Sequence, residues 1–168
     1  MTRRGLITAS LIVCFTAVLT VIALGLRGPI TASTVLATSK APGQHCASHE
    51  PTTLRALKQG DQRVVVVVKA FQPVQPPGAG LVVSLLTANK TKRHEITRFA
   101  VHPLRAFTAQ DSTRHQRFLV SLTEQAGLIE DGQPLCLEVG FDTSSGKLEG
   151  GMIEIEIELV KTSAALDK

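Results

Sequence analysis

The densest group of side chains that could ligate a metal consists of His45, Cys46 and His49, with Glu50 directly after them. Thiolate and imidazole are ligands that suit copper and zinc, and two histidines with one cysteine form a known copper ligand set. The pattern therefore predicts a segment that could bind copper or pass it on.

Cys46 also has a competing role. The chain holds three cysteines, and Cys14 lies inside an apolar segment, which leaves Cys46 and Cys136. Two such thiols pair by default in an oxidising compartment. A Cys46–Cys136 disulfide would close a long loop and stabilise the fold by about 4 kcal/mol on the chain-entropy model. The two roles exclude each other, because a disulfide sulfur is no longer a thiolate ligand.

Patterns typical of catalysis do not occur in the sequence. There is no nucleophile elbow, phosphate loop, dinucleotide fingerprint or zinc-protease pair. His94, His102 and His115 lie on different predicted segments and could converge only in three dimensions. We therefore expect a protein that is not an enzyme.

The basic charge of the chain does not indicate a nucleic-acid partner. The net charge is +4, but the chain has no Trp and no Tyr. Two of its basic residues, Arg3 and Arg4, precede the apolar segment, where positive charge sets membrane topology. We expect no binding to nucleic acid.

The N-terminal segment predicts export. The run from Leu6 to Leu26 has no charged residue and lies between Arg3 and Arg4 on one side and Arg27 on the other. About 20 apolar residues suffice to span a bilayer, so residues 1–27 are predicted to be a signal anchor or transmembrane helix. Everything after Arg27 is then extracytoplasmic, in the periplasm of a single-pass inner or plasma membrane protein.

Two alternatives concern the route of export. Small residues at 23–25, at the end of the apolar run, and at 35–37 offer signal-peptidase sites, and cleavage would give a secreted protein. The paired arginines also resemble a twin-arginine export signal.

The rest of the chain predicts an all-β fold. Residues 28–60 are rich in turn formers and are predicted to be a flexible linker, with one helical turn at 54–58. Residues 61–162 are predicted to form one antiparallel β-sandwich, either Greek-key or immunoglobulin-like, and residues 163–168 a disordered tail. The predicted strands are 63–71, 81–88, 95–101, 117–122, 134–141 and 153–159.

Two of these strands have informative patterns. The five valines at 64–68 indicate a central strand that is buried on both faces. From 153 to 159, isoleucine and leucine alternate with glutamate, so one face of that strand packs in the core and the other meets solvent or a basic partner.

The order of these elements resembles the C-terminal β-sandwich domain of plant polyphenol oxidases and some bacterial tyrosinases. The resembling stretches are a strand and short helix at 117–123, strands at 131–139 and 150–159, and upstream 94–99 with His102 and Pro103. In that family the sandwich covers the dicopper site of the oxidase and can place a bulky side chain over it. The resemblance implies a free-standing cover or chaperone for a separately encoded tyrosinase-like enzyme.

The same resemblance points to one residue. Phe107, in the loop after Pro103, is the predicted plug; the alternative is that Phe107 packs under its own loop. The sequence has no set of six helical histidines, so phenol oxidation by this chain is not implied. Three hypotheses follow: a membrane-tethered partner-binding sandwich, a copper-binding or copper-delivery protein, and a structural envelope protein.

Overall fold

The computed structural model describes residues 34–87, 90–144 and 146–165, and these residues form a mostly β domain. Its elements, in chain order, are β1 (Thr34–Thr38), β2 (Gly43–Ala47), α1 (Pro51–Gln59), β3 (Gln62–Gln75), β4 (Leu81–Thr87), β5 (Lys92–Phe99), η1 (Ser112–Arg114), β6 (Gln116–Val120), η2 (Ala126–Leu128), β7 (Leu135–Phe141), β8 (Glu149–Lys161) and α2 (Thr162–Ala165). The predicted membrane helix at 1–27 lies outside the described residues. Within them, no helix is long and apolar enough to cross a membrane.

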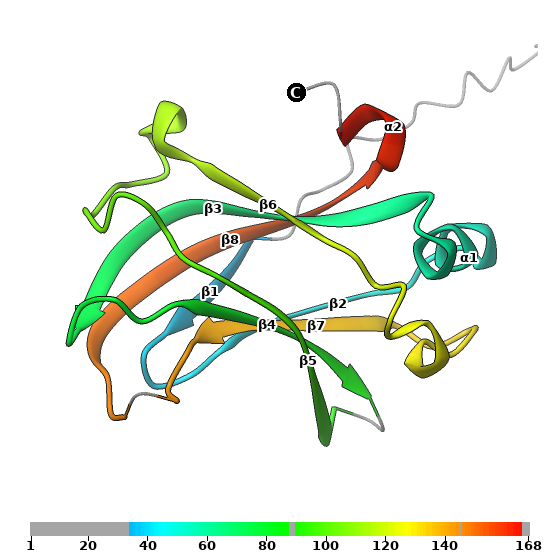
Figure 1. Cartoon of the computed structure of the whole chain (residues 1–168), viewed down its shortest axis with the longest axis horizontal. Coiled ribbons are helices and arrows are strands. Elements are labelled where there is room, and N and C mark those ends of the chain that lie inside the picture. The colour runs from blue at the N-terminus through cyan, green and yellow to red at the C-terminus, as the bar shows by residue number, and fades with distance from the viewer. Residues whose placement is uncertain (1–33, 88–89, 145, 166–168) are drawn as a thin grey trace, which may run out of the picture. The chain divides into compact units, whose positions relative to one another are not determined.

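The strands form two antiparallel sheets of four strands each, which lie as two layers in Figure 1. Sheet A has the order β1-β8-β3-β6, and sheet B has the order β2-β7-β4-β5. This arrangement of eight strands in two interlocked Greek keys is a jelly roll. The predicted all-β sandwich is therefore confirmed, and its strand order is of the Greek-key kind and differs from that of an immunoglobulin domain.

The five valines lie in β3, between β8 and β6 at the middle of sheet A, and all are buried. Val64, Val66 and Val68 belong to the core between the sheets. Val65 and Val67 lie on the outer face, where their cross-strand neighbours include Arg117, Glu156 and Glu158. The long stems of such side chains cover apolar surface while their charges stay in water.

The alternating pattern of β8 is also confirmed. Ile153 and Ile155 are fully buried. On the outer face, Glu156 pairs with Lys69 at 3.2 Å and Glu158 pairs with Arg117 at 2.6 Å. Because β8 lies between β1 and β3, these glutamates do not protect a sheet edge; they take part in ion pairs across the sheet.

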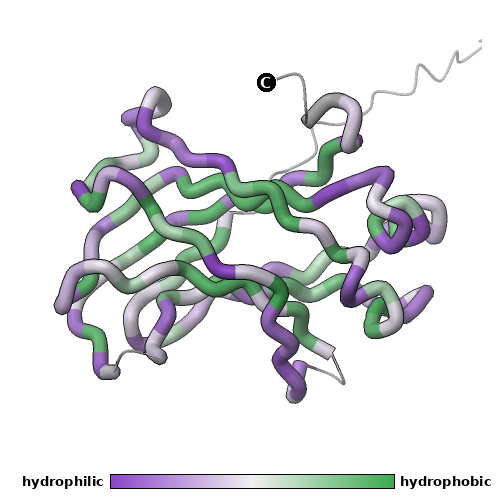
Figure 2. Tube along the Cα trace, in the orientation of Figure 1, coloured by the Kyte–Doolittle hydropathy of each residue, from purple (hydrophilic) through white to green (hydrophobic). Residues whose placement is uncertain are grey.

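The core fills the space between the sheets, and hydrophobic stretches run along the middle of both layers in Figure 2. Helix α1 covers one end of the sandwich, seen at the right of Figure 1, and its Leu54 and Leu57 are fully buried. The helix ends at Gly60, whose φ of +83° is a left-handed conformation that glycine adopts without strain.

The predicted flexible linker is wrong for residues 34–59, because they form β1, β2 and α1 as parts of the sandwich. Strand β1 pairs with β8 and β2 pairs with β7. The sequence of β2, Gly-Gln-His-Cys-Ala, has little strand propensity of its own, so pairing with the buried strand β7 decides its conformation. The rest of the predicted linker, residues 28–33, lies outside the described residues.

Two smaller boundaries also differ. The strand predicted at 63–71 is longer in the structure, because β3 continues through Pro73 to Gln75. The backbone N–H and C=O of Phe71 bond to Phe107, on the edge of β3 that faces away from β8. Backbone groups two residues apart in a strand point to the same edge, so the N–H that Pro73 lacks would not have bonded to β8. At the C-terminus, α2 takes up Thr162–Ala165, part of which was predicted to be disordered.

Candidate functional site

The outer face of sheet B carries a groove of about 500 Å³, here called the sheet B groove. Its floor is made by Val82, Ser84, Glu138 and Gly140 on the central strands β4 and β7. Its walls are the turn at 38–42 between β1 and β2, the segment 141–144 after β7, and the outward side chains of β5. A concave site of this size lies in the usual range for small ligands.

Small residues on the floor make the groove possible. Val82 lies opposite Gly140, and Ser84 lies opposite Glu138, in the register of β4 and β7. A Cβ atom on Gly140 would lie 2.9 Å from the Cβ of Pro42, which is closer than real Cβ contacts. Glycine at 140 therefore lets the wall turn cross directly over the sheet.

Glu138 is a buried charge at the bottom of the groove, and only 4% of the residue is exposed. Its Oε1 lies 2.5 Å from Nε of Arg93 on β5, and its Oε2 accepts a hydrogen bond of 3.0 Å from Nε2 of Gln44 on β2. A buried carboxylate is tolerated when such partners compensate its lost hydration. Glu138 thus ties together strands on both sides of β7.

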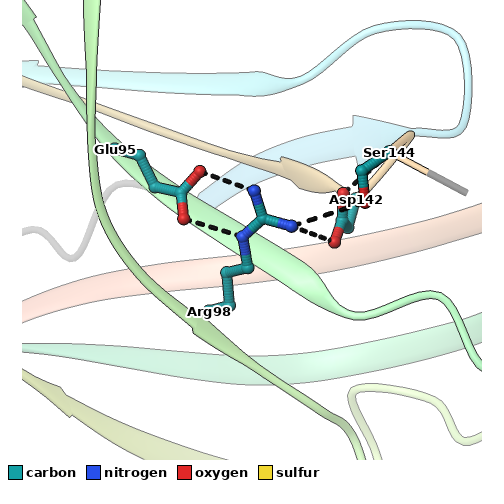
Figure 3. Close-up of polar contacts among 4 residues, drawn as sticks. All are labelled: Glu95, Arg98, Asp142 and Ser144. Carbon is teal, nitrogen blue, oxygen red and sulfur yellow. Dashed lines mark hydrogen bonds and ion pairs between the residues drawn. The ribbon is translucent and has the colours of Figure 1, made fainter.

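Arg98 holds two further carboxylates in place, as Figure 3 shows. Its Nε and Nη2 donate to the two oxygens of Glu95 at 2.7 and 2.8 Å. Its Nη1 donates to Oδ2 of Asp142 at 2.6 Å and to Oγ of Ser144 at 3.4 Å. The guanidinium therefore bridges β5 to the segment after β7.

These contacts keep both carboxylates charged. The hydrogen bond from Arg98 lowers the pKa of Glu95 below its usual range. The pKa of Asp142 is lowered chiefly by the backbone N–H of Ser144, which donates at 2.9 Å, with a smaller contribution from Arg98. The groove thus presents fixed, ionised acceptors at neutral and mildly acidic pH.

The predicted disulfide is confirmed, because Cys46 and Cys136 face each other across β2 and β7 and are bonded. The metal-ligand set of His45, Cys46 and His49 is correspondingly not formed: Cys46 is not a thiolate here, and its neighbour His45 points to the other face of β2. Among the described residues, no group of three potential ligands could hold a metal.

His45 and His49 still lie near each other. Burial lowers the pKa of both, and the charge of His45 lowers that of His49 further. Such a pair prefers to be neutral.

The predicted plug residue, Phe107, is not available to a partner. It is 5% exposed and belongs to the core. Its backbone pairs with Phe71 of β3, its ring lies 6.1 Å from the Phe71 ring, and the Arg114 guanidinium lies 5.3 Å from its ring centre. The alternative, packing under its own loop, is what the structure shows.

The three dispersed histidines do not converge. His94 contacts the Thr87 hydroxyl at 3.1 Å, and His115 contacts the Ala109 carbonyl at 3.0 Å. The exposed His102 lies in the loop after β5, where its backbone pairs with the side chain of Gln116. Each has a local structural role.

The sequence prediction missed the residues of the sheet B groove. One signal was present: Glu138 is a lone charge inside the otherwise uncharged strand Leu135–Phe141, and such a residue requires a partner. Its partners come from residues 44 and 93, which no spacing rule connects to it. The groove-lining residues include neither histidine nor cysteine within the described chain, and their polar groups are suited to hydrogen bonding.

Comparison of the chain with protein-family models, with curated proteins and with solved structures found no match in any of the three.

Proposed function

We propose that this chain is an exported, non-enzymatic binding module, held at the membrane by its N-terminal segment, that binds its partner in the sheet B groove. The observation that carries the proposal is the arrangement of Glu138, Glu95 and Asp142, each fixed by an arginine, around one groove. Groups that are already held in place lose little entropy on binding, so the groove is preorganised.

The opposite face of the sandwich supports this choice by contrast. On the outer face of sheet A, Glu156 and Glu158 pair with cations across the sheet surface. Surface ion pairs of that kind are common and have little energetic effect.

The disulfide supports an extracytoplasmic location. Structural disulfides persist in oxidising compartments and are rare in the cytosol. This agrees with the export predicted from the apolar segment at 6–26 and its flanking arginines.

A tyrosinase-like oxidase remains a prediction for the partner. This prediction rests on the resemblance in the order of elements along the sequence. Since Phe107 is buried, a cover role would have to use other residues. A tyrosinase-like reading frame next to the gene would favour this partner, and consistent absence of any copper oxidase from the genomes that encode the chain would exclude it.

The proposal is tested by amide hydrogen exchange on the full-length protein in a sugar-free detergent, with and without an envelope extract of the source organism. We expect slower exchange confined to the groove walls at 38–42, 93–98 and 142–144. No change anywhere, or slower exchange confined to the outer face of β8 and β6, would contradict the proposal.

A further inference from the structure

The charges that line the sheet B groove cancel. Lys40, Arg93 and Arg98 are positive, and Glu95, Glu138 and Asp142 are negative, which gives three charges of each sign. A lining without net charge attracts neither an anion nor a cation over a neutral molecule. The groove therefore favours a ligand without net charge.

The lining also disfavours an apolar ligand or a hydrophobic protein anchor. Its only aromatic residue among the described lining is Phe141, which is 7% exposed and belongs to the core. The chain has no Trp or Tyr at all. Protein interfaces depend on such side chains for their central contacts and are depleted of charge at their core.

The groove has hydrogen-bonding groups left over. Arg93 contacts Glu138 through its Nε, and 61% of the Arg93 side chain is exposed, so its Nη groups can reach a ligand in the groove. Carboxylate oxygens of Glu95, on the same β5 wall, and of Asp142, on the wall after β7, accept from Arg98 and retain further lone pairs. The groove thus offers donors and acceptors side by side on β5 and a further acceptor across from them.

Adjacent hydroxyl groups match this combination, because each hydroxyl is both a donor and an acceptor. We infer that the sheet B groove binds a neutral saccharide, with vicinal hydroxyls bridging Arg93 and Glu95 on the β5 wall and Asp142 on the wall after β7. The inference rests on the proposed function and specifies its ligand. Without an aromatic ring for stacking, a single site should bind weakly, with a dissociation constant on the order of 1 mM.

The inference is tested first with the same exchange experiment and a modified extract. Periodate cleaves vicinal diols, so an envelope extract is oxidised with periodate, reduced, desalted and compared with a mock-treated portion. We expect the slower exchange at 93–98 and 142–144 to disappear with the oxidised extract and to survive protease treatment of the extract.

A second test uses defined probes. Maltohexaose and cellohexaose are titrated into the full-length protein in sugar-free detergent and followed by saturation-transfer NMR, with hexagalacturonate as the charged control. Binding of at least one neutral hexasaccharide, more than about tenfold tighter than hexagalacturonate, is expected.

Arg93→Lys is the informative variant. Lysine preserves the ion pair with Glu138 but lacks the two Nη groups, so saccharide binding should weaken about tenfold while thermal stability stays the same. Arg117→Ala, on the outer face of sheet A, should bind like the wild type.

The outcomes separate the two proposals. If the periodate-treated extract still slows exchange in the groove and no neutral hexasaccharide binds, the saccharide inference is overturned while the binding function stands. If neither extract has any effect on the groove, the proposed function itself fails.

Discussion

At the scale of single residues, the described chain uses its charged side chains mainly to fix one another. Arg98 contacts two carboxylates and Arg93 contacts the buried Glu138, so three acidic groups gather in one groove without an uncompensated charge. Arg98 bridges its two carboxylates through its planar guanidinium, which a lysine could not replace at that position.

Removal of Arg98 should reveal itself in the acid dependence of stability. The pKa values of Glu95 and Asp142 are lowered in the folded protein, so their stabilising contribution is present above about pH 4 and is lost as the pH falls through the folded values. We expect Arg98→Ala to melt below the wild type at pH 7, and the difference in melting temperature to shrink as the pH falls below about 4. A difference that stays constant from pH 7 to pH 2.5 would show that Arg98 acts by packing alone.

A substitution of Phe107 tests whether this side chain is a core residue or an exposed plug. Because its ring is buried beside Phe71, Phe107→Ala should lower the free energy of unfolding by about 3–5 kcal/mol in a urea titration. The exposed neighbour Leu104 is the control, and Leu104→Ala should change the free energy of unfolding by less than about 1 kcal/mol. If Phe107→Ala is as stable as the wild type, the ring is not part of the core, and Phe107 would again be a candidate for an exposed plug.

At the scale of elements, the strongly patterned strands were predictable and the short ones were not. The valine run of β3 and the Ile–Glu alternation of β8 are long enough to determine both strand type and burial. Strands β1 and β2 have five residues each, and their conformation depends on pairing with β8 and β7, 88 or more positions later in the chain. A local pattern carries no information about such a distant partner.

The candidate site was unpredictable for the same reason. Gln44, Arg93 and Glu138 belong to three strands, β2, β5 and β7, that meet only through the jelly-roll strand order. By contrast, the disulfide needed only a count of the cysteines and the expectation of export.

The disulfide should matter most for β2, an edge strand that pairs with β7 alone. Replacing both Cys46 and Cys136 by Ser should lower the free energy of unfolding by about 2–5 kcal/mol. Amide exchange should accelerate most at 43–47. The control is Cys14→Ser, which leaves the Cys46–Cys136 pair intact; equal exchange at 43–47 in the double variant and the wild type would mean that strand pairing alone holds β2.

At the scale of the whole molecule, the sandwich presents two different outer faces. The face of sheet A has ion pairs over buried valines, and the face of sheet B has a groove with a charged floor. The proposed N-terminal anchor and the proposed binding face would together let the module capture a ligand close to a membrane surface.

Location can be checked together with disulfide formation. In cells, the full-length protein should fractionate with membranes and resist alkylation at Cys46 and Cys136 until it is reduced. Thiols that react freely at these two positions in fresh lysate would place the domain in a reducing compartment and contradict export.

The central claim is that the groove of sheet B, and not the face of sheet A, binds the ligand. Arg98 and Arg117 form a matched pair for this test, because their side chains are 48% and 49% exposed and each pairs with a glutamate. The measurement is the amount of envelope material that wild type, Arg98→Ala and Arg117→Ala each retain. We predict that Arg98→Ala retains about a tenth of the wild-type amount and Arg117→Ala retains all of it. Equal retention by the two variants would contradict the account.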